Sequence, residues 1–228
     1  MNILALDTSM GACSAALLAT NGARNLVLRE APMARGHAEA LIPMVAEVMQ
    51  ESGIAFADLD LIATTVGPGS FTGVRIAIAA ARGLALVTRA KLFGTDSLSV
   101  MARLARDAGT IPSGPFAVAV DARRGMLYLG LYDESARKLE GPVLVTPDDA
   151  VPLLPANLRA AAGNGAQLLA EAGARQGREI DAKLPELQPS AGALAEIALE
   201  SGEVSPTLRP LYLLPPDARP QAPAVLRR

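Results

Sequence analysis

The first part of the chain predicts three strands in succession. Ile3–Asp7 and Cys13–Ala19 are short apolar runs, and Asn25–Glu30 alternates apolar with polar residues. Short apolar runs between turns are typical of strands, and alternation is typical of a strand with one buried face. A tight turn at residues 20–22 separates the second run from the third. We therefore expect an antiparallel meander.

Helical patterns follow the meander. Residues 37–53 hold good helix formers throughout and end at Gly53, a residue type that commonly stops a helix. Ser70 is the expected N-cap of a second helix that runs to about Thr88. The other elements expected in this half are strands at Leu59–Val66 and Lys91–Gly94 and a helix at Ser97–Ala108.

The same order of elements then repeats. Phe116–Asp121 is an apolar run that ends in Asp before a hairpin, as Ile3–Asp7 does. The repeat predicts two similar α/β lobes, each a mixed sheet with helices on its faces, with both hairpins facing a cleft. Two unrelated α/β halves are the alternative. The further elements expected are strands at Met126–Asp133, Val143–Thr146 and Leu158–Ala162 and helices at Pro147–Leu154, Ala166–Ala172 and Ala191–Ser201.

The repeat also divides the chain. We expect an N-terminal lobe at residues 1–108, which carries the first two long helices, and a C-terminal lobe at residues 109–214. Residues 215–228 contain four prolines, and we expect this tail to be disordered.

The composition is that of a folded protein without the usual marks of a nucleic-acid binder. Half of the residues (50 %) are hydrophobic, 19 % are charged, and the formal net charge is −2. Nucleic-acid-binding domains are usually basic, and base stacking needs aromatic residues, which are 3 % here with no Trp. Any contact with RNA is therefore expected to run through a partner. Arg24 is the first basic residue and Asp7 interrupts the early apolar run, which argues against a signal peptide and for a cytoplasmic protein.

Metal chemistry is not expected. Cys13 and His37 are the only residues of their types, whereas zinc sites usually gather several such ligands. Cys13 lies in an apolar run and is expected to fill the core, and its isolation fits a reducing compartment. His37, at the start of a helix, is expected to make a hydrogen bond.

Two segments are candidates for holding phosphate. Asp7, Thr8 and Ser9 place a carboxylate and two hydroxyls after a strand, which suits a magnesium-bound phosphate, although an ordinary Asx turn has the same pattern. Asp121 is the matching residue of the second half, but Ala122 follows it where glycine would let a phosphate approach; two following arginines could supply charge instead. The glycine-rich segment at residues 67–73 resembles a phosphate loop but lacks its Lys, so a tight strand-to-helix turn is favoured.

The first two helices are candidates for a protein interface. The second has small residues at every fourth position, from Gly73 to Ala85, which let another helix approach closely. The first has two apolar rows, more than one buried face requires. The predicted interface residues are Leu41, Ile42, Val45, Met49, Gly73, Arg75, Ala77, Ala81, Arg82 and Ala85.

Five segments together resemble the bacterial TsaB/YeaZ family. They are ILALDTS, GHAEALIP, GPGSFTGVRIAIAAARGLA, DARRGMLYLGLY and a late LYL, and the resemblance spans residues 1–214. It implies the two-lobed fold shared by actin, Hsp70 and sugar kinases, with duplicated ribonuclease H-like lobes. Family members are relatives of TsaD and are also described as glycoprotease-like or M22 peptidase homologues.

The resemblance further implies a role in tRNA modification. TsaD, TsaB and TsaE act together to transfer a threonylcarbamoyl group to the adenine beside the anticodon of tRNAs that read codons starting with A. It implies a non-catalytic subunit that docks TsaD through its helix pair, self-associates through the same surface and meets tRNA only through the complex. No cofactor is expected in the lone subunit, whereas ATP or ADP with Mg²⁺ could bind at the cleft or in the complex. An actin-like ATPase or small-molecule kinase is the alternative, and a metallopeptidase is a weaker one.

Overall fold

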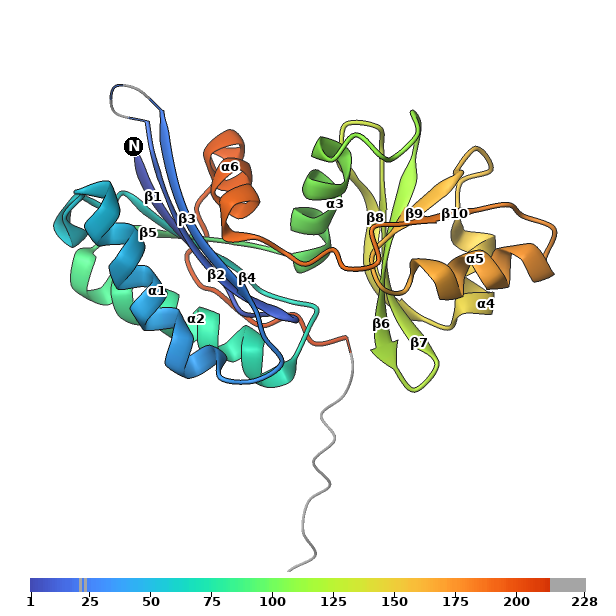
Figure 1. The fold of residues 1–228 in the computed structure, drawn as a ribbon, viewed down its shortest axis with the longest axis horizontal. Helices are drawn as coiled ribbons and strands as arrows, with labels where there is room; N and C mark the ends of the chain where they lie inside the picture. Colours follow the sequence, from blue (N-terminus) through green and yellow to red (C-terminus); the bar gives the residue numbers. More distant parts are fainter. Residues whose placement is uncertain (21, 23, 214–228) are drawn as a thin grey trace, which may run out of the picture.

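The computed structural model describes residues 1–20, 22 and 24–213. The tail expected to be disordered, residues 215–228, lies outside the described residues. Two five-stranded sheets stand side by side, each with helices on both faces (Figure 1). The structure thus has the two α/β lobes that the repeat and the resemblance predicted.

The first sheet has the order β3-β2-β1-β4-β5. The first three strands form the expected antiparallel meander, and β4 and β5 run parallel to β1. Helices α1 and α2 cover one face and α6 covers the other (Figure 1). The bounds are β1 Asn2–Asp7, β2 Ala12–Ala19, β3 Asn25–Pro32, α1 His37–Ser52, β4 Leu61–Thr65, α2 Phe71–Thr88, β5 Lys91–Thr95 and α6 Ala191–Ser201.

The second sheet has the order β10-β9-β6-β7-β8. Numbered within its own lobe, this order is the same as that of the first sheet, which confirms the duplication of architecture. Helices α4 and α5 cover one face and α3 the other. The bounds are α3 Ser97–Asp107, β6 Phe116–Arg123, β7 Met126–Tyr132, β8 Lys138–Val145, α4 Pro147–Ala150, β9 Ala160–Ala162, α5 Ala166–Arg175 and β10 Asp181–Lys183, with short 3₁₀ turns at Phe56–Asp58 and Val151–Leu153.

Strand β1 lies at the centre of the first sheet, and its sequence is an unbroken apolar run from Ile3 to Leu6. All six of its residues are buried. Successive side chains of a strand point to opposite faces, so Leu4 and Leu6 join the core under α1 and α2. Ile3 and Ala5 join the core under α6.

The lobes exchange one helix each, which corrects the expected boundary between residues 108 and 109. Helix α3 follows the first sheet in the chain but packs on the second, where Leu98 and Met101 are buried against Phe116 and its neighbours. Helix α6 follows the second sheet but packs on the first, through Leu194 and Ala198. The apolar faces of both helices are therefore buried across the boundary, and the chain crosses it twice.

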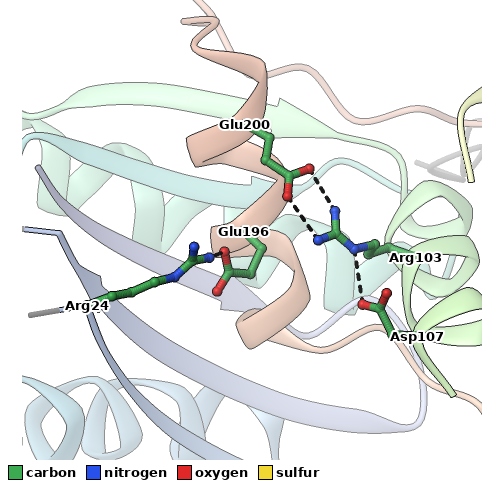
Figure 2. Close-up of polar contacts among 5 residues, drawn as sticks. All are labelled: Arg24, Arg103, Asp107, Glu196 and Glu200. Carbon is green, nitrogen blue, oxygen red and sulfur yellow. Dashed lines mark hydrogen bonds and ion pairs between the residues drawn. The ribbon is translucent and has the colours of Figure 1, made fainter. Parts of the chain in front are cut away.

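Ion pairs join the two exchanged helices (Figure 2). Arg103 of α3 makes two bonds to the carboxylate of Glu200 on α6, at 2.7 and 2.9 Å, and one to Asp107 on its own helix, at 3.0 Å. One turn earlier on α6, Glu196 pairs with Arg24, just before β3. The contact between α3 and α6 thus has an apolar part and a charged edge.

Most predicted elements are confirmed within two residues, and the exceptions lie in the second lobe. Strand β8 starts at Lys138, well before the expected Val143, because its first residues are exposed and carry no apolar pattern. The helix expected at Pro147–Leu154 changes to a 3₁₀ turn at Val151, where Pro152 removes an N–H donor. Strand β10 was not predicted, since it has three residues and none is fully buried.

One helix of the described residues meets the length and composition of a membrane span. Helix α2 has 18 residues with a mean hydropathy of 1.4, and 28 % of it is buried within the structure. One side of α2 packs on the first sheet. The apolar residues on its other side are exposed.

Candidate functional site

A cleft of about 1090 Å³ lies between the lobes. Its first-lobe wall is formed by the β1–β2 hairpin and by the N-terminal ends of α1 and α2. Its second-lobe wall is formed by the β6–β7 hairpin and Asn164. Residues 211–213 lie along its edge. The two hairpins predicted to face a cleft do so, but their side chains are used differently.

Asp7 is enclosed by its own lobe. It is 1 % exposed and accepts hydrogen bonds from the Oγ and N atoms of Ser9, at 2.9 and 3.2 Å, and from the hydroxyl of Thr65. Burial raises the pKa of the carboxyl from 3.8 to about 6, and the hydrogen bonds from Thr65 and Ser9 oppose that rise. Asp7, Thr8 and Ser9 are all buried and none lines the cleft, so the prediction that they bind nucleotide is corrected to an internal Asx turn.

The glycine-rich segment closes over this hairpin. The N–H of Ser70 donates to the carbonyl of Ser9 at 2.7 Å, and the hydroxyl of Thr8 donates to the carbonyl of Gly73 at 2.6 Å. A Cβ atom on Gly69 or Gly73 would overlap the carbonyl oxygens of Ser9 and Thr8. The glycines are therefore needed for close backbone packing. The favoured interpretation as a tight strand-to-helix turn is confirmed, with Ser70 as the N-cap.

Two more polar groups of the hairpin are occupied. His37 Nε2 lies 3.0 Å from the carbonyl of Met10, which confirms the hydrogen-bonding role expected of His37. The N–H of Gly11 donates to Gln188 Oε1 at 2.8 Å. The hydroxyls of Thr8 and Ser9 and the N–H groups of Ser9 and Gly11, which could hold a phosphate, are thus used within the chain.

The second hairpin keeps its polar residues at the cleft. Asp121 is exposed, its carboxylate accepts the N–H of Arg123 at 2.7 Å, and its own N–H donates to Asn164 Oδ1 at 2.9 Å. Arg123 and Arg124 have φ values of 66° and 54°, and both line the cleft. Ala122 is buried in the second lobe. Of the four nucleotide candidates, the structure therefore leaves Asp121 in the cleft.

No metal centre appears among the described residues. Within residues 1–20, 22 and 24–213, no three His, Cys, Asp or Glu side chains are grouped so that they could hold a metal ion. Cys13 is buried in the core, and burial raises its pKa to about 11. Its sequence interpretation as a core residue is confirmed.

The small-residue stripe of α2 faces inward, which corrects the predicted interface. Gly73, Ala77 and Ala81 are buried against the first sheet, and Ala85 is half-buried. The predicted row of α1 that holds Leu41 and Val45 is buried in the same core, together with Met49. Six predicted interface residues therefore belong to the protein's own core. They are Leu41, Val45, Met49, Gly73, Ala77 and Ala81.

Three predicted residues stay at the surface. Ile42 is 52 % exposed, Arg75 donates from Nε to the Tyr212 hydroxyl at 2.6 Å, and Arg82 bonds to the carbonyl of Leu208. The two arginines thus tie the C-terminal segment to α2.

The outer side of α2 holds apolar residues that the sequence analysis missed. Leu86 and Val87 are 84 % and 82 % exposed, and Ala79 and Gly83 are also exposed. At about 100° per residue these positions lie opposite the buried stripe. A second small stripe was visible in the sequence, but choosing between the two required knowing which side packs on the sheet.

Comparisons with known proteins place the chain in a family. The profile described as TsaD, tRNA N6-adenosine threonylcarbamoyltransferase, matches residues 31–184. The structure of YeaZ from Pseudomonas aeruginosa superposes with a TM-score of 0.78 at 30 % identity, covering 92 % of this chain and all of that one. The chain belongs to the TsaB/YeaZ family.

Two relatives from bacteria show the range of similarity. The tRNA threonylcarbamoyladenosine biosynthesis protein TsaB of Escherichia coli is 40 % identical over 133 residues, which are 58 % of this chain and 55 % of that protein. The matching part thus spans about half of the length of that TsaB/YeaZ relative. An uncharacterized protein of Mycobacterium tuberculosis is 31 % identical over 224 residues, or 96 % of this chain and 95 % of that protein.

Proposed function

We propose that this protein acts in the threonylcarbamoyladenosine modification of tRNA, as a cytoplasmic, non-catalytic subunit that docks the catalytic TsaD protein. In this proposal TsaE completes the complex, tRNA is the substrate of the assembly, and two copies of the chain associate through the same surface when TsaD is absent. The names of the TsaB relatives and the TsaD profile support the pathway.

The outer face of α1 and α2 carries the proposal. We define it by residues Ile42, Ala46, Ala79, Gly83, Leu86 and Val87, all of them exposed. A helix with apolar residues on two opposite sides is usually buried on both sides. Helix α2 is covered on one side, and its outer side is exposed. The small side chains of Ala79 and Gly83 permit close approach of another helix, and a Cβ on Gly83 would meet nothing within 4 Å.

Self-association and its replacement by TsaD would use the same apolar surface. The charged residues of the two helices are engaged within the chain, because Glu47 and Glu51 pair with Arg29, and Arg75 and Arg82 bond to the C-terminal segment. In a two-fold arrangement the same patch meets itself, so the apolar outer faces of α1 and α2 can pack on those of a second copy. The match of the TsaD profile to this chain suggests that TsaD presents a helix pair of similar design.

A non-catalytic role is favoured over the two alternatives. The first phosphate hairpin is filled by the chain's own groups, which argues against an actin-like ATPase or kinase. A metallopeptidase needs clustered ligands, and the described residues offer none. Both observations support a non-catalytic role.

The decisive experiment compares an outer and an inner substitution on α2. Gly83→Trp should weaken capture of TsaD from the same organism at least about tenfold and leave the unfolding temperature nearly unchanged. Ala77→Trp, on the buried stripe, should instead destabilise the fold, since overpacking costs about 1–3 kcal/mol. Normal capture by the folded Gly83→Trp variant would show that the interface lies elsewhere. In cells lacking their own TsaB, the wild-type chain should restore the modified nucleoside and Gly83→Trp should not.

A further inference from the structure

An exposed aromatic pair marks the edge of the interlobe cleft. The rings of Phe71, at the start of α2, and Tyr212 have centroids 5.3 Å apart, and the residues are 45 % and 43 % exposed. The Arg75 guanidinium lies 3.6 Å from the centre of the Phe71 ring, and its Nε–H donates to the Tyr212 hydroxyl. In a chain with four Phe, three Tyr and no Trp, this pair places scarce aromatic surface beside the cleft.

The charge of the cleft has the opposite sign to that of the whole chain. Arg35, Arg123 and Arg124 line it, against the two acids Glu39 and Asp121. The carboxylate of Asp121 also accepts the backbone N–H of Arg123, a bond that leaves its negative charge in place. Three arginines and two acids give these five side chains a formal charge of +1, whereas the whole chain carries −2, so the cleft is a local site of attraction for anions.

Two amide side chains add donors to the same walls. Asn164 Oδ1 accepts from the N–H of Asp121, and Gln188 Oε1 accepts from the N–H of Gly11. Because each oxygen is used by the backbone, the NH₂ group is the end that each side chain offers to a ligand. The cleft thus presents mainly donors and cations, with flat aromatic rings at its edge.

We propose that the cleft holds a single-stranded segment of RNA, with an unstacked base on the Phe71–Tyr212 edge and phosphates beside Arg35 and Arg123. Aromatic rings beside a cationic groove are the usual means of binding single strands. A free nucleotide fits less well, because the phosphate position at the first hairpin is taken by Gln188 and Ser70. The inference rests on the proposed function, which makes tRNA the RNA concerned.

The test measures binding of an RNA hairpin with the sequence of a tRNA anticodon stem-loop to the full-length chain, with and without TsaD, between about 50 and 200 mM salt. Tyr212→Leu should weaken binding at least about fivefold at every salt concentration, because one stacking contact is lost. Arg123→Gln should weaken it and lower the slope of log affinity against log salt by about 1.

Arg89→Gln is the matched control. Arg89 also has a left-handed backbone, with φ 63° against 66° for Arg123, but it caps the far end of α2. That end lies about 20 Å along the helix from Ile76, the last residue of α2 that lines the cleft, at about 1.5 Å per residue. This variant should bind the RNA as the wild-type chain does.

Three results would overturn the inference: wild-type affinity in both cleft variants, no RNA binding by the wild-type chain at 50 mM salt, or displacement of the RNA by ATP. Restored tRNA modification in cells together with any of these would reject the RNA site and leave the proposed function standing. Failure of the wild-type chain to restore modification would instead count against the proposed function.

Discussion

Asp7 gives the sharpest test of how the first hairpin is built. Its carboxyl is almost fully buried, and the surrounding donors come from Ser9 and Thr65 of the same lobe. Burial raises its pKa to about 6. Asp7→Asn keeps the shape of the side chain and removes the charge, so the variant isolates the cost of ionising this group inside the protein.

The sign and size of the effect follow from linkage. Between pH 4 and pH 6 the folded state holds a proton that the unfolded state has released, so the free energy of unfolding falls as the pH rises. At about 1.36 kcal/mol per pKa unit, the rise of the Asp7 pKa from 3.8 to about 6 corresponds to roughly 3 kcal/mol. The cost is absent below pH 4, develops through this window and is complete above pH 6.

Urea unfolding of both proteins from pH 4 to pH 8 measures this cost. The stability of Asp7→Asn relative to wild type should increase by about 3 kcal/mol across that range, because all other titrating groups cancel in the comparison. Asp58→Asn, which removes an exposed carboxyl, controls for the loss of one charge. A stability difference between Asp7→Asn and wild type that stays constant within about 0.5 kcal/mol would refute an enclosed, perturbed Asp7.

Two other substitutions test the packing of the lobes. Gly73→Ala should destabilise the protein by more than about 1 kcal/mol in urea unfolding, because the new Cβ would overlap the Thr8 carbonyl. Gly83→Ala, in open space on the same helix, should stabilise the protein by about 0.5–1 kcal/mol. Equal effects of the two substitutions would contradict the inward packing of the stripe. Glu200→Gln should lower the free energy of unfolding by about 0.5–1 kcal/mol, and a double-mutant cycle with Arg103→Ala should give a coupling energy of similar size. Additive effects would show that the Arg103–Glu200 pair of Figure 2 does not contribute to stability.

Much of the fold could be predicted because its signals are local. The Gly53 stop, the Ser70 cap and the apolar run of β1 each depend on residues close in sequence, and the structure has each of them. The exchange of α3 and α6 could not be predicted in this way. Both helices have an apolar face, and the apolar pattern of a helix does not say which of two sheets will cover it.

The candidate site shows the same limit. A small-residue stripe such as Gly73–Ala81 signals close packing, but the sequence does not say whether the neighbour is a partner or the chain's own sheet. The sequence around Asp7 likewise has the pattern of a phosphate hairpin. Only the structure shows that the start of α2 packs there, through the hydrogen bond from Ser70 to Ser9. The cleft edge was also missed, because Phe71 and Tyr212 are far apart in the chain.

The exchanged helices and the filled hairpin together suit a subunit that presents surfaces of fixed shape. Helix α3 packs on the second sheet and α6 on the first, and the two helices contact each other through Val100 and the Arg103–Glu200 pair. Changing the angle between the lobes would therefore break this contact. The β1–β2 hairpin is held by a hydrogen bond from Ser70, at the N-terminal turn of α2, to the carbonyl of Ser9. That turn also fixes the start of the helix whose outer face is proposed to bind TsaD. The contacts that close the first hairpin therefore also set the position of the proposed docking helix.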